Sequence, residues 1–277
     1  TDEPGTAERQ PLKARTAWKP TPLLVPAEAR DALLVQAAEA ERQGLWYGSE
    51  PLGALDLYAA LAEADPPMPE ARIGRDRMIA RLRERFETER IEGNLELAEE
   101  IDAVLDVVSP ADAAVRDDGL SAARRAAAAT ASGDARREAG QWLAPRGESA
   151  VAAYREALAA VPGFAPASAG LAAIEQALIE RAEASVSSGD FDAAEANLRR
   201  AARVGRDPDA VQDGRAALAQ ARSAAAAVAV DDANEAIDRL DLPRAATRLT
   251  DAQRIDPQAP GLDELGSRLA LARRYGH

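Results

Sequence analysis

Apolar residues recur every three or four positions along nearly the whole chain from Pro26 onward. This spacing is typical of amphipathic helices, whereas the strict alternation of a half-buried strand is sustained nowhere. Ser109-Pro110 and Asp207-Pro208 each place a capping side chain before a proline at the first helical position. The pattern therefore predicts an all-α fold over residues 25–277. Residues 1–24, which lack the helical period and are rich in Pro, Thr and charge, are predicted to be a flexible N-terminal tail.

The sequence matches itself when it is shifted by 96 residues, which lays Trp46 on Trp142 and Gly74 on Gly170. Other identities hold the same register, among them Ala54/Ala150, Tyr58/Tyr154, Pro66/Pro162 and Gly93/Gly189. A third, partial copy follows with one residue deleted. The repeat predicts a duplicated two-hairpin unit of about 96 residues, with copies near 25–118 and 119–214 and a partial copy over 215–277.

Five segments share a small residue, a larger residue four positions later, and a small or apolar residue three positions after that. The pairs of small and larger residues are Ala54/Tyr58, Ala98/Asp102, Ala150/Tyr154, Ala194/Leu198 and Ala245/Leu249. The small residue allows close approach of the two helices of a hairpin, and the larger one fills the groove between neighbouring hairpins. Each segment is therefore predicted to be the second helix of a hairpin, and Asp102 departs from the pattern.

These markers resemble those of the tetratricopeptide repeat (TPR) family, in which a glycine and an aromatic open the turn and a proline closes the unit. Gly189, Phe191, Ala194 and Leu198 fit that pattern well, and Pro257 closes a later unit. The resemblance implies a right-handed solenoid of about five helical hairpins that binds protein or peptide partners in its groove. The marker alanines are spaced wider than the 34 residues of the family, so the first helices are predicted to be longer, notably about 209–239.

Composition excludes several classes of function. The chain has no cysteine, its one histidine is His277, and its net charge is −13. Thiolate or histidine metal sites and cysteine or histidine catalysis are therefore not expected, and nucleic acid is disfavoured as a partner. No apolar run reaches the roughly 20 residues of a membrane span, and no phosphate-binding glycine loop is present. The sequence thus predicts no enzyme activity, no metal, no cofactor and no direct membrane insertion.

The strongest candidate for a binding site is the predicted first helix over 71–90. Arg77, Arg81 and Arg85 lie at positions i, i+4 and i+8, so their guanidinium groups form a row suited to a carboxylate-rich peptide or a phosphate. The alternative is that Glu84, Glu87 and Glu89 neutralise the row and leave a solvated helix face. The matching positions of the second copy are Ala173, Ala177 and Arg181, so the scaffold does not require three arginines.

Aromatic residues supply a second candidate. Trp46, with Tyr47 beside it, and Trp142 occupy equivalent hairpin corners. They predict either an exposed platform for a partner or a packing plug at the turn. Trp18 lies in the predicted tail, where a docking motif and a disordered residue are equally compatible with its neighbours.

These features predict a non-catalytic scaffold that binds a protein or peptide. A second hypothesis makes the chain an accessory region of a larger bacterial envelope enzyme, because it is similar to arrays that precede catalytic domains such as formylglycine-generating-enzyme-like domains. The start at Thr1, without Met, predicts a mature or trimmed product, and a periplasmic or envelope location is favoured over the cytoplasm. Exposed ends of such arrays also allow a homodimer.

Overall fold

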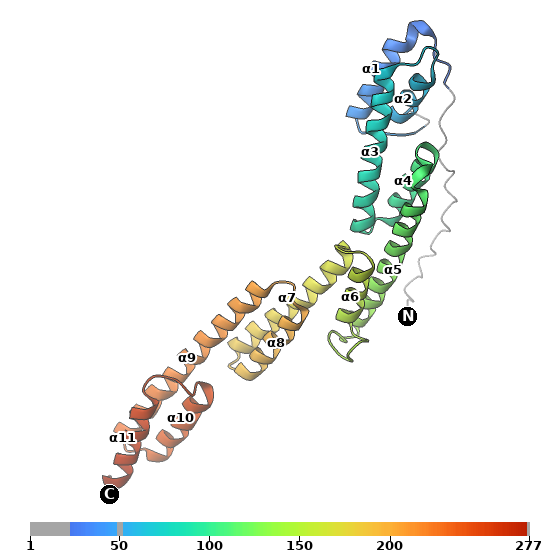
Figure 1. Ribbon diagram of the computed structural model, residues 1–277. Helices are drawn as coiled ribbons and strands as arrows, with labels where there is room; N and C mark the ends of the chain where they lie inside the picture. The colour runs from blue at the N-terminus through green and yellow to red at the C-terminus, as the bar shows by residue number, and fades with distance from the viewer. Residues whose placement is uncertain (1–22, 49–51, 276–277) are drawn as a thin grey trace, which may run out of the picture. The chain divides into compact units, whose positions relative to one another are not determined.

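The computed structural model describes residues 23–48 and 52–275, which are entirely helical apart from turns and loops (Figure 1). Over these residues no strand occurs, so the prediction of an all-α fold is confirmed. The α-helices are α1 (Arg30–Arg42), α2 (Ala54–Glu63), α3 (Pro69–Glu92), α4 (Leu95–Val108), α5 (Ala113–Glu138), α6 (Ala150–Ala160), α7 (Ala165–Ser187), α8 (Phe191–Val204), α9 (Pro208–Asp238), α10 (Leu242–Ile255) and α11 (Leu262–Tyr275). Two 3-10 turns, Ala27–Ala29 and Pro110–Asp112, precede α1 and α5. Most of the predicted tail, with Trp18, and His277 lie outside the described residues.

The chain divides into two compact units. The first comprises Thr1–Thr130 and Glu156–Pro166, and the second comprises Ala131–Arg155 and Ala167–His277. In the first unit α2 packs against both α1 and α3, and α3 packs against α4. In the second unit α9 packs against α8, α10 and α11. Packing between neighbours in the chain is the arrangement that a helical repeat fold requires.

The predicted second helices correspond to α2, α4, α6, α8 and α10, and the five marker alanines are fully buried. The long helix expected near 209–239 is α9, whose first turn is capped by Asp207, since its carboxylate accepts the Ala210 N–H at 3.0 Å. Helix α11 falls within the predicted all-α region but lies beyond the five predicted hairpins. It packs on α9 and α10 and buries Leu262, Leu265 and Leu269.

Three joints between a second helix and the next first helix use a large side chain against a glycine sixteen positions later. A methyl group built on Gly74 would lie 2.5 Å from Cε1 of Tyr58, and one built on Gly170 would lie 2.4 Å from Cζ of Tyr154. The third joint is the Leu198–Gly214 pair, where the corresponding distance to Cδ2 is 2.7 Å. Glycine is therefore required where a tyrosine ring lies directly on the helix backbone.

The fifth marker, Leu249 of α10, departs from its prediction as a groove-filling residue. It is only partly buried, at the edge of the apolar cluster that α9, α10 and α11 share, whereas Tyr58, Tyr154 and Leu198 are fully buried. Sixteen positions after Leu249 stands the buried Leu265 rather than a glycine. Both leucines belong to that cluster, and without a glycine at position 265 the close approach seen at the Tyr–Gly joints has no equivalent here.

Two further residues expected to pack the repeat are less enclosed than predicted. Pro257, the closing proline, is exposed in the turn after α10, so it limits the backbone conformation there without adding to the core. Phe191, at the start of α8, is partly buried against the cluster around Leu198. The marker pattern therefore locates these helix ends correctly but overstates how deeply the side chains are buried.

The joint between α4 and α5 is polar instead, as the departure of Asp102 from the marker pattern indicates. Arg116, which is buried, donates from Nε to Asp102 and from Nη2 to Asp106, each at 2.5 Å, and from Nη1 to the Ser109 carbonyl. Burial raises the pKa of Asp102 above its ordinary value, and the Arg116 hydrogen bond opposes that effect. A buried ion pair here takes the place of the tyrosine and glycine.

Each first helix ends in the same backbone motif, with a left-handed residue just past its last turn. These residues are Gly44, Gly93, Gly140, Gly189 and Leu240, with φ of 76°, 84°, 74°, 79° and 59°. The next N–H returns to a carbonyl five residues back, as in Leu45 to Ala40 and Gln141 to Arg136, both at 2.9 Å. The caps at Gly44 and Gly93 thus recur 96 positions later at Gly140 and Gly189. Leu240, which ends the last first helix, is the one member that lacks the freedom of glycine.

Candidate functional site

Helix α3 presents the predicted arginine row on a surface of the first unit. It buries Met78 and Phe86 against α2 and α4, so the row must lie on the remaining faces. The side chains of Arg77, Arg81 and Arg85 are 46%, 45% and 50% exposed. All three guanidinium groups are therefore within reach of a ligand.

Glu41, at the last turn of α1, anchors the first two arginines. Arg77 donates from Nε to Oε1 at 2.8 Å and from Nη2 to Oε2 at 2.6 Å, and Nη1 of Arg81 lies 2.9 Å from Oε1. The hydroxyl of Tyr58 donates to Oε2 of Glu41 at 3.0 Å. The Arg77 hydrogen bond lowers the pKa of Glu41 below its ordinary value despite the opposing effect of burial, so this carboxylate is charged at neutral pH.

Glu89 holds the third arginine in the same way. Nε of Arg85 lies 2.5 Å from Oε1 of Glu89, whose side chain is 3% exposed, and Asn94 donates to Oε2 of Glu89 at 2.6 Å. Glu87 is paired with Arg90 instead. Of the three expected neutralising residues, only Glu89 contacts the row among the described residues, and Glu41 acts with it.

The row therefore consists of three guanidinium groups resting on two buried carboxylates. In the described chain, these two carboxylates are the acidic partners of Arg77, Arg81 and Arg85. One positive charge remains in excess, and the carboxylates fix the orientation of the side chains from below. Oriented guanidinium groups are suited to bind carboxylates or phosphates without a large loss of side-chain entropy. That they do so remains a prediction.

The aromatic candidates lie at the α1–α2 corner. Trp46 and Tyr47 are half-buried against the core of the first unit, and the Trp46 carbonyl accepts the Leu55 N–H at 2.9 Å. The Tyr47 hydroxyl donates to Oε1 of Glu100 at 3.2 Å. Both residues contribute packing at this corner, and their role in partner binding remains a prediction.

The equivalent corner of the second unit contains a pairing that sequence reasoning missed. The Arg181 guanidinium lies over the ring of Trp142, 4.1 Å from its centroid, and Nε1 of Trp142 donates to the Arg137 carbonyl at 3.0 Å. Arg181 matches Arg85 in the repeat but stacks on an aromatic rather than pairing with a glutamate. The sequence signal was Ser185 at the position that matches Glu89, which leaves Arg181 without the acidic partner that Arg85 has.

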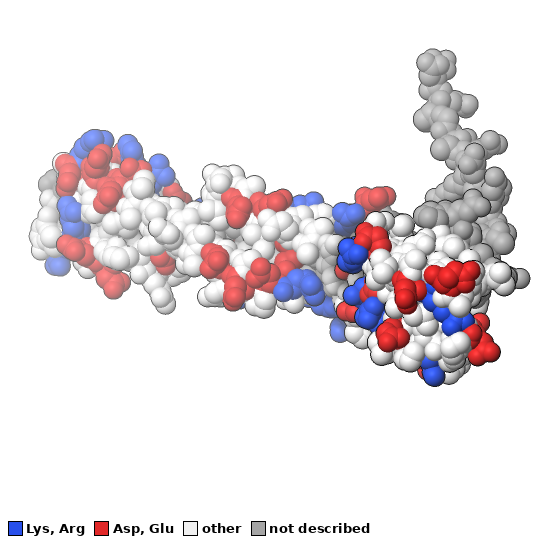
Figure 2. Space-filling view, turned by 90° about the horizontal axis from the view of Figure 1, so that it is seen from above, with Lys and Arg blue, Asp and Glu red and all other residues white. Residues whose placement is uncertain are grey.

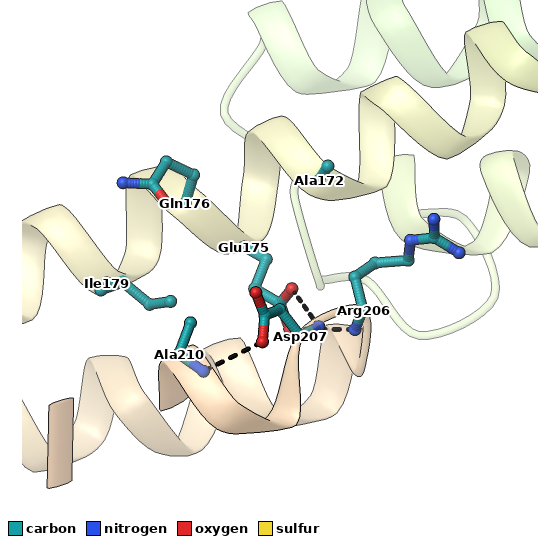
Figure 3. A pocket seen from close by; sticks show the side chains of 7 residues that line it. All are labelled: Ala172, Glu175, Gln176, Ile179, Arg206, Asp207 and Ala210. Atoms are coloured by element: carbon teal, nitrogen blue, oxygen red, sulfur yellow. Dashed lines mark hydrogen bonds between the residues drawn. The ribbon is translucent and has the colours of Figure 1, made fainter. Parts of the chain in front are cut away.

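A shallow hollow of about 310 Å³ lies beside the start of α9 (Figure 3). The buried carboxylate of Glu175, from α7, accepts the backbone N–H groups of Arg206 at 3.0 Å and Asp207 at 2.8 Å. These donors belong to the turn that leads into α9 and would otherwise lack partners within the helix. Glu175 thus occupies the position that an anionic ligand would take, and its role there is to cap α9.

On the face drawn in Figure 2, acidic and basic side chains are interspersed. Over residues 23–48 and 52–275, no group of three or more metal-binding side chains converges. Within the same residues, no helix combines the length and apolar character that crossing a bilayer requires.

Comparison with models of known protein families, with curated proteins and with solved structures finds no match to this chain. The resemblance to TPR proteins therefore rests on the sequence markers alone. The described fold supports a broader class: an all-α protein of helices packed in adjacent pairs, compatible with a helical repeat.

Proposed function

We propose that the chain is a non-catalytic scaffold that binds a protein or peptide along the α3 face of its first unit. The observation that carries the proposal is the exposure of three arginines that are already oriented by buried Glu41 and Glu89. Such groups can engage an anionic partner without first being ordered, which reduces the entropic cost of binding.

The second unit supports a role for the row beyond folding. There the Tyr154–Gly170 joint has the same packing, although the positions matching Arg77 and Arg81 are Ala173 and Ala177. Since this kind of joint can form without the arginines, the packing of the tyrosine ring does not by itself account for their presence in the first unit.

The same proposal includes a finer description of the fold: a right-handed, TPR-like solenoid built from a duplicated unit of about 96 residues and a partial third copy. The recurring C-terminal caps and the repeated Tyr–Gly joints support the duplication. Solenoid surfaces of this kind bind extended partners along their first helices, which is where α3 lies in the repeat.

Photo-crosslinking at the α3 face tests the function. A photoreactive amino acid replaces Ile73, which is 65% exposed four residues before Arg77. In lysate of the native cell we expect discrete crosslinked proteins that weaken strongly when R81A and R85A are added. Placing the same group at Val228 of α9, which is 62% exposed, provides the control. Identical crosslinking with and without the arginines would reject the proposal.

The accessory-region hypothesis, the homodimer and the envelope location remain predictions. The intact mass of the endogenous protein distinguishes a free scaffold from the arm of a larger enzyme.

A further inference from the structure

We propose that the α3 row recognises an extended acidic peptide whose carboxylates occupy alternate positions. This inference rests on the proposed function, because it names the class of partner for the same surface. Its basis is the geometry of the row together with the way in which Glu41 and Glu89 leave part of each guanidinium unused.

The spacing of the arginines matches that of an extended chain. Residues four apart on a helix are separated by about 6 Å along its axis. In an extended strand, side chains on the same side are about 6.6 Å apart, because successive residues point to opposite faces. Arg77, Arg81 and Arg85 can therefore contact three successive same-side carboxylates, whereas a block of adjacent acidic residues directs every second carboxylate away from α3.

Arg81 is the centre of the proposed site. It gives Glu41 only its Nη1 group, and the structure places no other described carboxylate on it. The Nε–Nη2 edge of its guanidinium is thus left for a bidentate contact. Arg77, by contrast, uses that same edge for Glu41. Each guanidinium thus gives one part to a buried glutamate and keeps another for a ligand. This arrangement fits a ligand that supplies one carboxylate for each arginine.

An apolar residue completes the recognition motif. Ile73 precedes Arg77 by one helical step and is the one large hydrophobic residue exposed on α3. An extended peptide can place an apolar side chain on Ile73 at the next alternate position. A helical ligand is less suited to this surface, because it would need a continuous apolar seam to bury.

The test uses two labelled peptides of identical composition, with the full chain as receptor. One has the sequence Leu-Ser-Glu-Ser-Glu-Ser-Glu, and the other has Leu-Ser-Ser-Ser-Glu-Glu-Glu. By fluorescence anisotropy we expect the alternating peptide to bind about tenfold more tightly, with affinity falling as salt rises. R81A should weaken it about tenfold and R81K several-fold, because lysine keeps the charge and loses the fork.

Two controls keep the result interpretable. R72A removes an exposed arginine about 180° around the same helix from Arg81, and it should leave affinity unchanged. R81A leaves Glu41 with Arg77 and Tyr58, so the fold is retained, which circular dichroism verifies.

Equal binding of the two peptides would overturn the alternating register. Complete displacement of the alternating peptide by inorganic phosphate, at equal charge concentration, would also overturn the inference. Tighter binding of a helix-stapled peptide with glutamates four residues apart would do the same. If neither peptide binds while crosslinking at position 73 still depends on the arginines, this inference fails and the proposed function stands. If both measurements are insensitive to R81A, both fail.

Discussion

Tyr58 of the first unit and Tyr154 of the second fill the same kind of joint, but their hydroxyl groups find different partners. Tyr58 donates to Glu41, whose side chain is 8% exposed and carries two arginines. Tyr154 donates to Asp134 at 2.6 Å, and that carboxylate is 47% exposed with only Arg137 nearby, at 3.7 Å. The ring packing is common to both, whereas the charge network belongs to the first.

The comparison shows that a Tyr–Gly joint needs one carboxylate acceptor for the tyrosine hydroxyl, whereas arginines at the positions of Arg77 and Arg81 are present only in the first unit. Burial, reinforced by the hydrogen bond to Asp134, raises the pKa of Tyr154 to about 12, and burial likewise raises that of Tyr58. Both tyrosines are therefore neutral donors, and one carboxylate acceptor suffices for each. Arg77 and Arg81 exceed this requirement.

The largest expected effect comes from filling the glycine sites. Both G74A and G170A should lower the free energy of unfolding by about 1–3 kcal/mol, because the new methyl group overlaps a tyrosine ring that cannot move aside. Urea denaturation of the full chain measures the change.

G214A is the matched control, since its methyl group meets only the flexible end of Leu198. It should stay within about 0.5 kcal/mol of the parent, because alanine favours a helix over glycine. Comparable losses in all three variants would show that the tyrosine rings do not make their joints special.

A smaller effect distinguishes the two acceptors. E41Q should destabilise the first unit by about 1–2 kcal/mol, since it removes a charged acceptor from three donors. D134N, at an exposed site, should cost less than about 1 kcal/mol. Hydrogen exchange of α1 and α3, compared with α5 and α6, measures each locally, and equal losses would contradict the comparison.

The pH dependence follows from the lowered pKa of Glu41. Its stabilising contribution is present above its ordinary pKa of 4.5 and is lost as the pH falls through the lower folded value. The difference in exchange protection between the parent and E41Q should therefore be constant near pH 7 and shrink in acid below that value. If the difference in exchange protection instead grows in acid, the pKa of Glu41 is raised in the folded state rather than lowered.

The smallest expected change in stability concerns the left-handed residues that end the first helices. Leu240 holds φ of 59° where the other first helices have glycine, and its side chain is largely exposed. L240G should raise stability by about 0.5–1 kcal/mol, and G189A should lower it by about 1 kcal/mol. Thermal unfolding of both variants checks this, and a destabilised L240G would mean that the leucine side chain contributes packing.

Much of this architecture could be predicted from the sequence, because its determinants are local. Helical periodicity and Pro caps located α9 to within one residue, and the marker alanines located the five second helices. Helix α11 carries no marker, so the sequence placed it in the helical region without assigning it to a hairpin.

Features that depend on a second helix could not be predicted in the same way. Glu41 is 36 residues from Arg77, and pairing them requires the relative register of two helices, which periodicity within one helix does not specify. The burial of Leu249 was overestimated for a related reason, because it depends on Leu265 in a helix that the markers did not indicate.

The sixteen residues between Tyr58 and Gly74 also bear on the kinetics of folding. Joints closed over so short a stretch give a low contact order, which favours fast folding. Similar joints along one chain, however, compete for the same partners, and mispairing is a characteristic failure of repeat proteins. A wrong pairing that placed Ala173 where Arg77 belongs would leave Glu41 without its strongest partner. The pair of Glu41 and Arg77 therefore gives the folding chain a way to discriminate one tyrosine joint from its duplicate.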